Sequence, residues 1–361
     1  MTTRRTFLAS LAAAAAAPRA TWADAGAPAV LAAGRDASGN YTLSGLSSQG
    51  AERFRISLPS RGHAAAAHPT RPQAVAFARR PGRFARVVDC PSGQIDARLD
   101  APEGRHFYGH GAFLHGGEML ATSENDIATG AGVIGLWAPD EGYTRIGEFA
   151  SGGIGPHEIL ALAQDRLVIA NGGIRTHPDS GREKLNLPTM RPNLSLASPE
   201  RGVLDQAELA PELHLSSIRH IALGPAGQIA LAMQWQGDVM DAGPLLGLWT
   251  PGTPPHLCEA PPLRQMAMQG YAGSVAFSGD GKAVAISSPR GGEVQIFEAA
   301  TGSFLNHWQR PDTCGLAPLG TGFLTSDGAG GMMALDTTGK ARLLAHHPTA
   351  WDNHIIPLNQ A

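Results

Sequence analysis

One stretch of the sequence decides the fold: GSVAFSGDGKAVAISS at residues 273–288, continued by GEVQIFE at residues 292–298. Three short runs of small, β-branched and aromatic residues are separated by two glycine-rich turns. Gly279-Asp280-Gly281 is typical of a tight β-hairpin, and Gly291-Gly292 indicates the next turn. The stretch therefore predicts strand, hairpin, strand, turn and strand.

The same pattern returns along the rest of the chain. Units of about 40 to 60 residues with about four strands each are typical of β-propeller blades, which must stack on their neighbours to bury their faces. Six units begin near His63, His110, His157, His220, Ser274 and Cys314, and a seventh, partial unit begins at Trp351. In the longest unit, residues 171–192 are polar and predict a loop laid over one face.

The seventh unit lacks strands of its own, and the apolar runs at residues 30–34 and 41–45 can supply them. The two ends of the chain would then share one blade and close the ring, which leaves no free sheet edge between the first and last blades. We therefore predict an all-β, seven-bladed β-propeller that occupies residues 26–361 as a single domain.

Residues 1–25 have the features of an export signal. Arg4-Arg5 precedes Phe7-Leu8 and an Ala/Leu run, and small residues offer cleavage positions after Ala23 or Ala25. The apolar run is far shorter than the ~20 residues that span a bilayer. We predict a twin-arginine signal peptide, a periplasmic mature protein and no membrane span in that protein.

Composition excludes several function classes. The chain has 361 residues, a formal charge of −3 and 45 glycines, which fits neither a coiled coil nor a disordered tail and gives no basic surface for nucleic acid. A monomer is expected. Three isolated cysteines form no zinc motif, and a disulfide between Cys90 and Cys258 stays an open alternative.

Aligning the units by their first strands places one residue of each at an equivalent position. The innermost strands of a propeller line its axis, so these residues should converge near one mouth of the channel. Five of the seven are histidine, and several imidazoles beside a thiol suit a transition metal. The predicted ligands are His63, His110, His157, His220, Cys314 and His354, with Ser274 at the seventh position.

Polar neighbours of this ring could orient the ligands through hydrogen bonds. The two arginines could instead form ion pairs with Glu158 or Asp126. The candidates are Glu124, Asn125, Asp126, Glu158, Asp312, Asn353, Arg219 and Arg290. The other histidines are interpreted as surface or turn residues, with His115 the first exception to consider: His68, His106, His115, His214, His256, His307, His346 and His347.

Several motifs resemble a known family: GIGPHE at 153–158, NGGIRTHPD at 171–179, SIRH at 217–220, QWQG at 234–237, SPRGG at 288–292 and WDNH at 351–354. Together they are similar to the exported bacterial propellers of domain of unknown function 1513. Members are typically encoded beside imelysin-like proteins and a di-haem peroxidase-like protein. The resemblance implies periplasmic iron handling, with imelysin-like or cytochrome-type partners, and assigns no catalytic residue.

The preferred hypothesis is a periplasmic propeller that binds a transition-metal ion, iron before copper, for uptake or delivery to a partner. Two alternatives stay open because propellers host many functions. One is a metal-free interaction scaffold for neighbouring exported proteins, in which each histidine only bonds within its blade. The other is a metal-dependent oxidoreductase or lyase with Glu158 as acid or base. No catalytic motif is present, and a hydrolase in particular lacks a nucleophile elbow.

Overall fold

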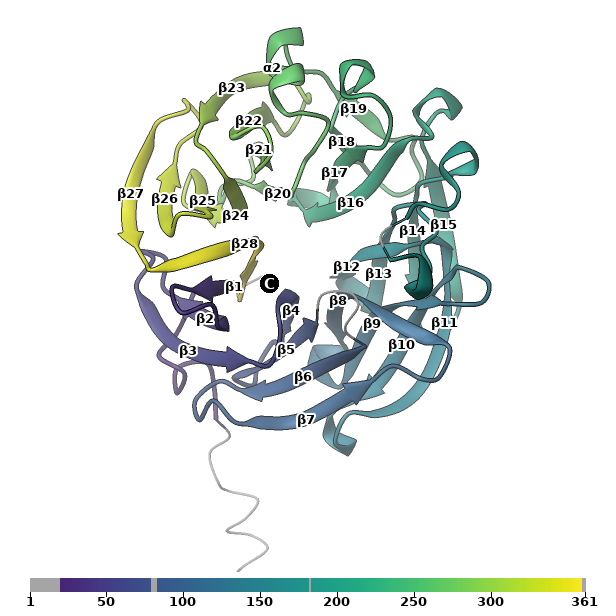
Figure 1. Cartoon of the computed structure of the whole chain (residues 1–361), viewed down its shortest axis with the longest axis vertical. Helices are drawn as coiled ribbons and strands as arrows, with labels where there is room; N and C mark the ends of the chain where they lie inside the picture. The colour runs from purple at the N-terminus through teal and green to yellow at the C-terminus, as the bar shows by residue number, and fades with distance from the viewer. Residues whose placement is uncertain (1–19, 79–82, 182, 359–361) are drawn as a thin grey trace, which may run out of the picture.

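The computed structural model describes residues 20–78, 83–181 and 183–358. These residues form seven four-stranded antiparallel sheets arranged around one axis, as predicted (Figure 1). The predicted signal peptide lies mostly outside the described residues. Of its last residues, Trp22 packs beside the sheets, and its indole Nε1 donates a hydrogen bond of 2.9 Å to the carbonyl of His68.

Each sheet is one blade, whose strands run in order from the axis to the rim. Blade 1 holds β28 (Thr349–Pro357), β1 (Val30–Asp36), β2 (Tyr41–Leu46) and β3 (Glu52–Leu58). Blade 2 holds β4 (Gly62–Ala67), β5 (Gln73–Ala78), β6 (Phe84–Asp89) and β7 (Ile95–Asp100). Blade 3 holds β8 (Arg105–Leu114), β9 (Met119–Asp126), β10 (Ala131–Ala138) and β11 (Thr144–Ile154).

The remaining blades follow the same order. Blade 4 holds β12 (Pro156–Leu162), β13 (Arg166–Asn171), β14 (Asn193–Ser198) and β15 (Gly202–Glu208). Blade 5 holds β16 (Ser216–Leu223), β17 (Ile229–Trp235), β18 (Leu246–Trp249) and β19 (His256–Cys258). Blade 6 holds β20 (Ser274–Phe277), β21 (Ala283–Ser288), β22 (Glu293–Glu298) and β23 (Phe304–Gln309). Blade 7 holds β24 (Thr313–Leu319), β25 (Gly322–Asp327), β26 (Gly331–Leu335) and β27 (Ala341–His346).

Helices are short and lie in the connections. The α-helix α2 spans Pro262–Ala267, and a long connection between β13 and β14 contains the 3₁₀ turns η4 (Pro178–Ser180) and η5 (Leu187–Thr189). The other 3₁₀ turns are η1 (His115–Gly117), η2 (Pro139–Glu141), η3 (Ala163–Asp165), η6 (Pro211–Leu213), η7 (Pro225–Gly227) and η8 (Val239–Asp241). Within the described ranges, no helix is long and apolar enough to cross a membrane.

The hydrophobic core lies between neighbouring blades. Phe77 of blade 2 packs edge-on against Phe107 of blade 3 with ring centroids 6.0 Å apart, and Trp137 continues the cluster. Each fully buried side chain of this size contributes about 1.5–3 kcal/mol relative to an exposed one. Because these contacts cross between sheets, no blade can bury its faces alone.

The ends of the chain share blade 1, as the sequence predicts. Strand β28 pairs antiparallel with β1, with Ile355 opposite Ala32 and Ala350 opposite Arg35. Strand β1 pairs in turn with β2. The ring is therefore closed by hydrogen bonds between the last strand of the chain and the first.

Six of the seven innermost strands are irregular at the residue predicted to line the axis. At these positions the inner strand contains one or two more residues than its neighbour, which is a β-bulge. Only β20, which contains Ser274, keeps a regular register in this region. A bulge changes the direction of a side chain, so these irregularities affect how the axial residues point.

The structure bears on two predictions about single residues, namely the exposure of two histidines and the possible disulfide. His68 and His106 are buried, with 2% and 6% of their surfaces exposed, so they are not surface residues. His68 is nevertheless a turn residue, because its Nδ1 accepts hydrogen bonds from the backbone N–H groups of Thr70 and Arg71. The open question of a disulfide is answered by free, buried thiols at Cys90, Cys258 and Cys314.

Candidate metal centre

Five imidazole rings meet on the axis of the propeller, one each from blades 1 to 5. His157, His220, His354 and His63 follow one another in a closed circuit, with neighbouring ring centroids 4.8–5.3 Å apart. His110 contacts all four of them at 4.9–6.2 Å. The histidines predicted to converge therefore form one cluster, which we call the axial cluster.

Possible ligand atoms in the axial cluster fall into two groups that share His110. One group is His63, His110 and His157, and the other is His110, His220 and His354; in each group the ligand atoms lie within 4.8 Å of one another. Nitrogens bound to one ion at ~2.0–2.1 Å in a tetrahedron lie roughly 3.4 Å apart. The ligand atoms of either group would have to approach one another by up to about 1.4 Å to reach that spacing. All three members of the second group are buried.

Glu158 links two of these imidazoles. Its Oε2 accepts a hydrogen bond of 3.0 Å from the backbone N–H of Ile221 and lies 3.2 Å from Nδ1 of His220. Its Oε1 lies 3.7 Å from Nδ1 of His110. A carboxylate that accepts from Nδ1 fixes the tautomer that leaves Nε2 for a metal. Glu158 is therefore placed to orient His220, and its other carboxylate oxygen lies beside His110.

Burial keeps His110, His157 and His220 neutral. Desolvation lowers the pKa of His220 to about 3, with a further contribution from the charge of Arg219. Desolvation is also the main reason why the pKa values of His110 and His157 lie well below the usual value. Neutral imidazole is the form that binds a metal, so these side chains are prepared for binding at neutral pH.

Desolvation also raises the pKa of Glu158 to about 7. The nearby His354 and the hydrogen bond from Ile221 act in the opposite direction. The carboxyl group therefore changes its charge close to neutral pH, in contact with two histidines of the axial cluster.

Two buried nitrogens of the axial cluster lack a hydrogen-bond partner among the described residues. These atoms are Nε2 of His110 and Nδ1 of His157. A buried polar atom without a partner costs about 1–3 kcal/mol, and coordination to an ion would remove that cost. The donor set therefore fits a metal that prefers nitrogen ligands, such as iron, copper or zinc.

Cys314 and Ser274 complete the ring of equivalent positions but belong to neither ligand group. The Cys314 Sγ donates to the backbone carbonyl of Asp312 at 3.1 Å, and burial raises the pKa of this thiol far above its usual value. The Ser274 Oγ accepts from the backbone N–H of Leu316 and so joins blades 6 and 7. A protonated thiol is a poor ligand.

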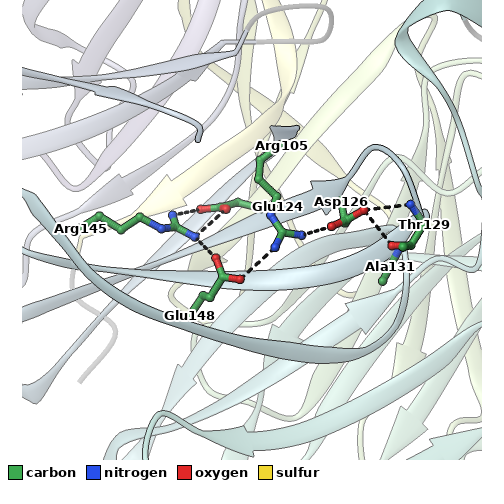
Figure 2. A network of polar contacts seen from close by, with 7 residues as sticks. All are labelled: Arg105, Glu124, Asp126, Thr129, Ala131, Arg145 and Glu148. Carbon is green, nitrogen blue, oxygen red and sulfur yellow. Dashed lines mark hydrogen bonds and ion pairs between the residues drawn. The ribbon is translucent and has the colours of Figure 1, made fainter. Parts of the chain in front are cut away.

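Glu124 and Asp126 bind arginines of their own blade. Glu124 is fully buried and receives two hydrogen bonds, of 2.7 and 3.0 Å, from Arg145. Asp126 receives one of 2.7 Å from Arg105, and Glu148 bridges the two arginines (Figure 2). This network connects β8, β9 and β11. Glu124 and Asp126 therefore have a structural role as partners of the two arginines.

Most other predicted partners lie around the axial cluster without a described bond to it. Asn125 bonds to His106 at 3.1 Å, and Asn353 bonds to the Tyr271 hydroxyl at 3.4 Å. The guanidinium of Arg290 stacks on the ring of Tyr271 at 4.3 Å. Glu158 contacts His220, and Asp126 binds Arg105. Arg219 acts on the cluster through its charge.

His115, the exception considered first, lies outside the axial cluster. Its Nδ1 is 3.1 Å from Asp165, and its Nε2 is 3.8 Å from Glu200. All three side chains are partly or well exposed to solvent. His115 is thus part of a surface ion-pair group and offers a control position for tests of the axial cluster.

A cavity of about 250 Å³, lined mostly by apolar residues, lies on one side of the axial cluster. His110, His220, His354 and Glu158 line it together with Ser274. All other described lining residues are alanine, glycine, proline, valine, leucine, isoleucine or phenylalanine. The sequence alone did not predict this cavity. Each inner strand contributes only a few residues to its lining, so no single stretch of sequence indicates it.

Fold and site together define a seven-bladed β-propeller with a buried histidine cluster on its axis. The chain belongs to the family described as protein of unknown function (DUF1513), whose profile matches residues 56–358. The resemblance in the sequence motifs is thereby confirmed at the level of the family. Among curated proteins, no relative matches significantly.

Solved structures share the fold at low sequence identity. A chain from "Crystal Structure of Mitotic Checkpoint Complex" has a TM-score of 0.55 and 12% identity, and the match covers 79% of this chain and 77% of that one. A chain from "Kuenenia stuttgartiensis Hydrazine Synthase" has a TM-score of 0.56 and 12% identity, with 84% and 88% covered. These similarities establish the propeller architecture.

Proposed function

We propose that this protein binds one transition-metal ion on its axis, through His110, His220 and His354. The observation that supports the proposal is the convergence of three buried imidazoles, two of which lie beside the Glu158 carboxylate. Iron is the first metal to test and copper the second, because both accept imidazole ligands. His63 and His157 form the alternative group around His110.

In this proposal the chain's residues hold the ion and control its surroundings. Glu158 keeps Nδ1 of His220 directed away from the ion, and burial keeps the imidazoles of His110 and His220 unprotonated. A bound ion would supply Lewis acidity or one-electron chemistry. We propose uptake of the metal or its delivery to a partner as the role, in the periplasm after twin-arginine export, with an imelysin-like or cytochrome-type protein as the partner.

The test is the metal content of the protein purified from the periplasm, measured by elemental mass spectrometry. Anaerobic titration of the purified protein with Fe(II) and with Cu(I) measures the affinity. We expect about one ion per chain, and we expect His110→Asn to lose at least nine-tenths of it, because His110 belongs to both ligand groups. His115→Asn is the matched control and should keep the metal, since His115 lies in a surface ion-pair group.

Equal metal content in the two histidine variants would place the ion elsewhere. A folded wild-type protein that contains no metal and binds neither Fe(II) nor Cu(I) would overturn the proposal. The interaction-scaffold hypothesis would then replace it.

A further inference from the structure

We infer that the apolar cavity beside the axial cluster admits a small uncharged ligand to the metal site. The inference deepens the proposed function and rests on it, because the cavity and the proposed ligands meet at His110, His220 and His354. The ligand class is a neutral molecule of the size of a diatomic gas or a short apolar compound. This ligand would occupy the cavity and reach the metal ion at its end.

The chemistry of the lining determines this class. Apart from three histidines, Glu158 and Ser274, the described lining residues are apolar, among them Ala112, Ile159, Ala222, Val275, Leu316 and Ile355. An ion that enters past these residues meets no charged side chain other than Glu158 among the described lining residues, and hydration that is not fully replaced costs several kcal/mol or more. An uncharged apolar molecule gains from the same surface. The cavity thus discriminates by charge.

The polar groups gather at the metal end of the cavity. Of the five polar side chains that line it in the described part of the chain, His110, His220, His354 and Glu158 belong to the metal site or contact it. Three protein ligands leave further coordination positions for an outside molecule. A few convergent polar groups at the end of an apolar pocket are the usual arrangement of a small-molecule site.

Residues with positive charge surround the axial cluster elsewhere and are absent from the described cavity lining. Arg219 acts on His157 and His220, and Arg290 stacks on Tyr271, whose hydroxyl bonds to Asn353. His63 and His157 are likewise not among the lining residues.

The first experiment tests the cavity without metal. Xenon, an apolar atom, is dissolved under pressure with the full-length, metal-free protein, and methyl signals are followed by NMR. We expect saturable shifts for the methyl groups of Ala112, Ile159 and Ala222, and none for Ala300, which is exposed in an outer turn. Absence of shifts at the cavity methyl groups would overturn the inference, whatever the metal content of the protein.

The second experiment tests access to the ion. Nitric oxide is mixed with the Fe(II)-loaded protein, and formation of the iron nitrosyl is followed by stopped-flow absorbance and by its electron paramagnetic resonance signal. We expect Ala112→Phe and Ala222→Phe to slow nitrosyl formation at least tenfold, because each phenyl group would fill part of the cavity. Ala300→Phe is the control and should react like the wild type.

The outcomes separate this inference from the metal site. Circular dichroism and bound iron are measured for each variant, and two filling positions are used in case one variant fails to fold. Stoichiometric iron that forms no nitrosyl, or forms it at the same rate in both filled variants, would overturn the inference and leave the proposed metal site intact. Failure to bind iron, together with xenon in the cavity, would overturn only the metal site.

Discussion

At the scale of single residues, the charge of Glu158 affects both the stability of the fold and the proposed metal ligands beside it. Its carboxyl group is mostly buried and contacts two imidazoles that are themselves neutral. Folding therefore favours the protonated form of Glu158 and the unprotonated form of His220. The two groups make opposite contributions to the pH dependence of stability, and substitution can separate them.

Glu158→Gln should stabilise the metal-free protein above neutral pH. The pKa of Glu158 rises from 4.5 to about 7 on folding, so the unfolded chain loses this proton at lower pH than the folded protein. The wild type therefore loses stability as pH rises from 4.5 to about 7, by up to about 3 kcal/mol from this group. Glutamine keeps the acceptor for the Ile221 N–H and lacks the charge.

The measurement is urea unfolding of the wild type and Glu158→Gln at pH 5 and pH 8, with a chelator present. The difference in unfolding free energy should favour the variant more at pH 8 than at pH 5. Glu118→Gln, at an exposed position, is the control and should show no such trend. A difference that does not change with pH would contradict the assignment of a raised pKa.

Sequence alone predicted the converging histidines because their position in each repeat is the same. It could not predict that Cys314 would be held by the Asp312 carbonyl, since one backbone hydrogen bond depends on the local turn. It also interpreted His106 as a surface or turn residue, whereas His106 is a buried residue of β8. Equivalent positions were predictable, and contacts between blades were not.

At the scale of elements, the bulges in the inner strands position the histidines of the axial cluster, and they are harder to predict than the strands. The glycine-rich turns predicted the strands and their order, and the structure confirms them. The extra residues in β12 and β16 could not be predicted, because a bulge interrupts the alternation on which strand prediction depends. These bulges place His157 and His220 at the axis.

Blade 3 offers a test of how an element is held together. Arg145 neutralises Glu124, which is fully buried, through the two hydrogen bonds drawn in Figure 2. Arg145→Ala should lower the free energy of unfolding by about 3–5 kcal/mol, because it leaves an uncompensated buried charge. Denaturant unfolding at pH 7 measures the loss.

Arg191→Ala is the matched control for that substitution. Arg191 pairs with Glu208 in a bridge whose side chains are 75% and 46% exposed, so its loss should change stability by about 0.5 kcal/mol or less. Similar losses for the two variants would show that Glu124 obtains compensation from elsewhere. Combining Arg145→Ala with Glu124→Leu should recover part of the loss, since the buried charge is then removed.

At the scale of the whole molecule, ring closure and the proposed metal site depend on the same strand. Strand β28 pairs with β1 and also presents His354 to the axial cluster. Ile355, the next residue, is 4% exposed and packs with Val30, Ala32 and Leu324. The first and last strands of the chain, a core cluster and a predicted ligand therefore meet in one blade.

Ile355→Ala should consequently weaken closure. Removing a buried isoleucine side chain costs about 2–5 kcal/mol, whereas Ile146→Ala, at a position that is 50% exposed, should cost about 0.5 kcal/mol or less. Denaturant unfolding measures both values. Hydrogen exchange of β1 and β28 should accelerate more than that of blade 4 if closure is the step affected.

A bound ion would act across the ring, because His110, His220 and His354 come from blades 3, 5 and 1. Fe(II) at 100 times its dissociation constant should raise the unfolding free energy of the wild type by about 2.7 kcal/mol, and a chelator should remove that gain. The gain should persist in Ile355→Ala, whose ligands are intact, and should be much smaller in His354→Ala. If His354→Ala gains as much as the wild type, the ion does not bridge the closing blade, and the His63, His110 and His157 group becomes the site to test.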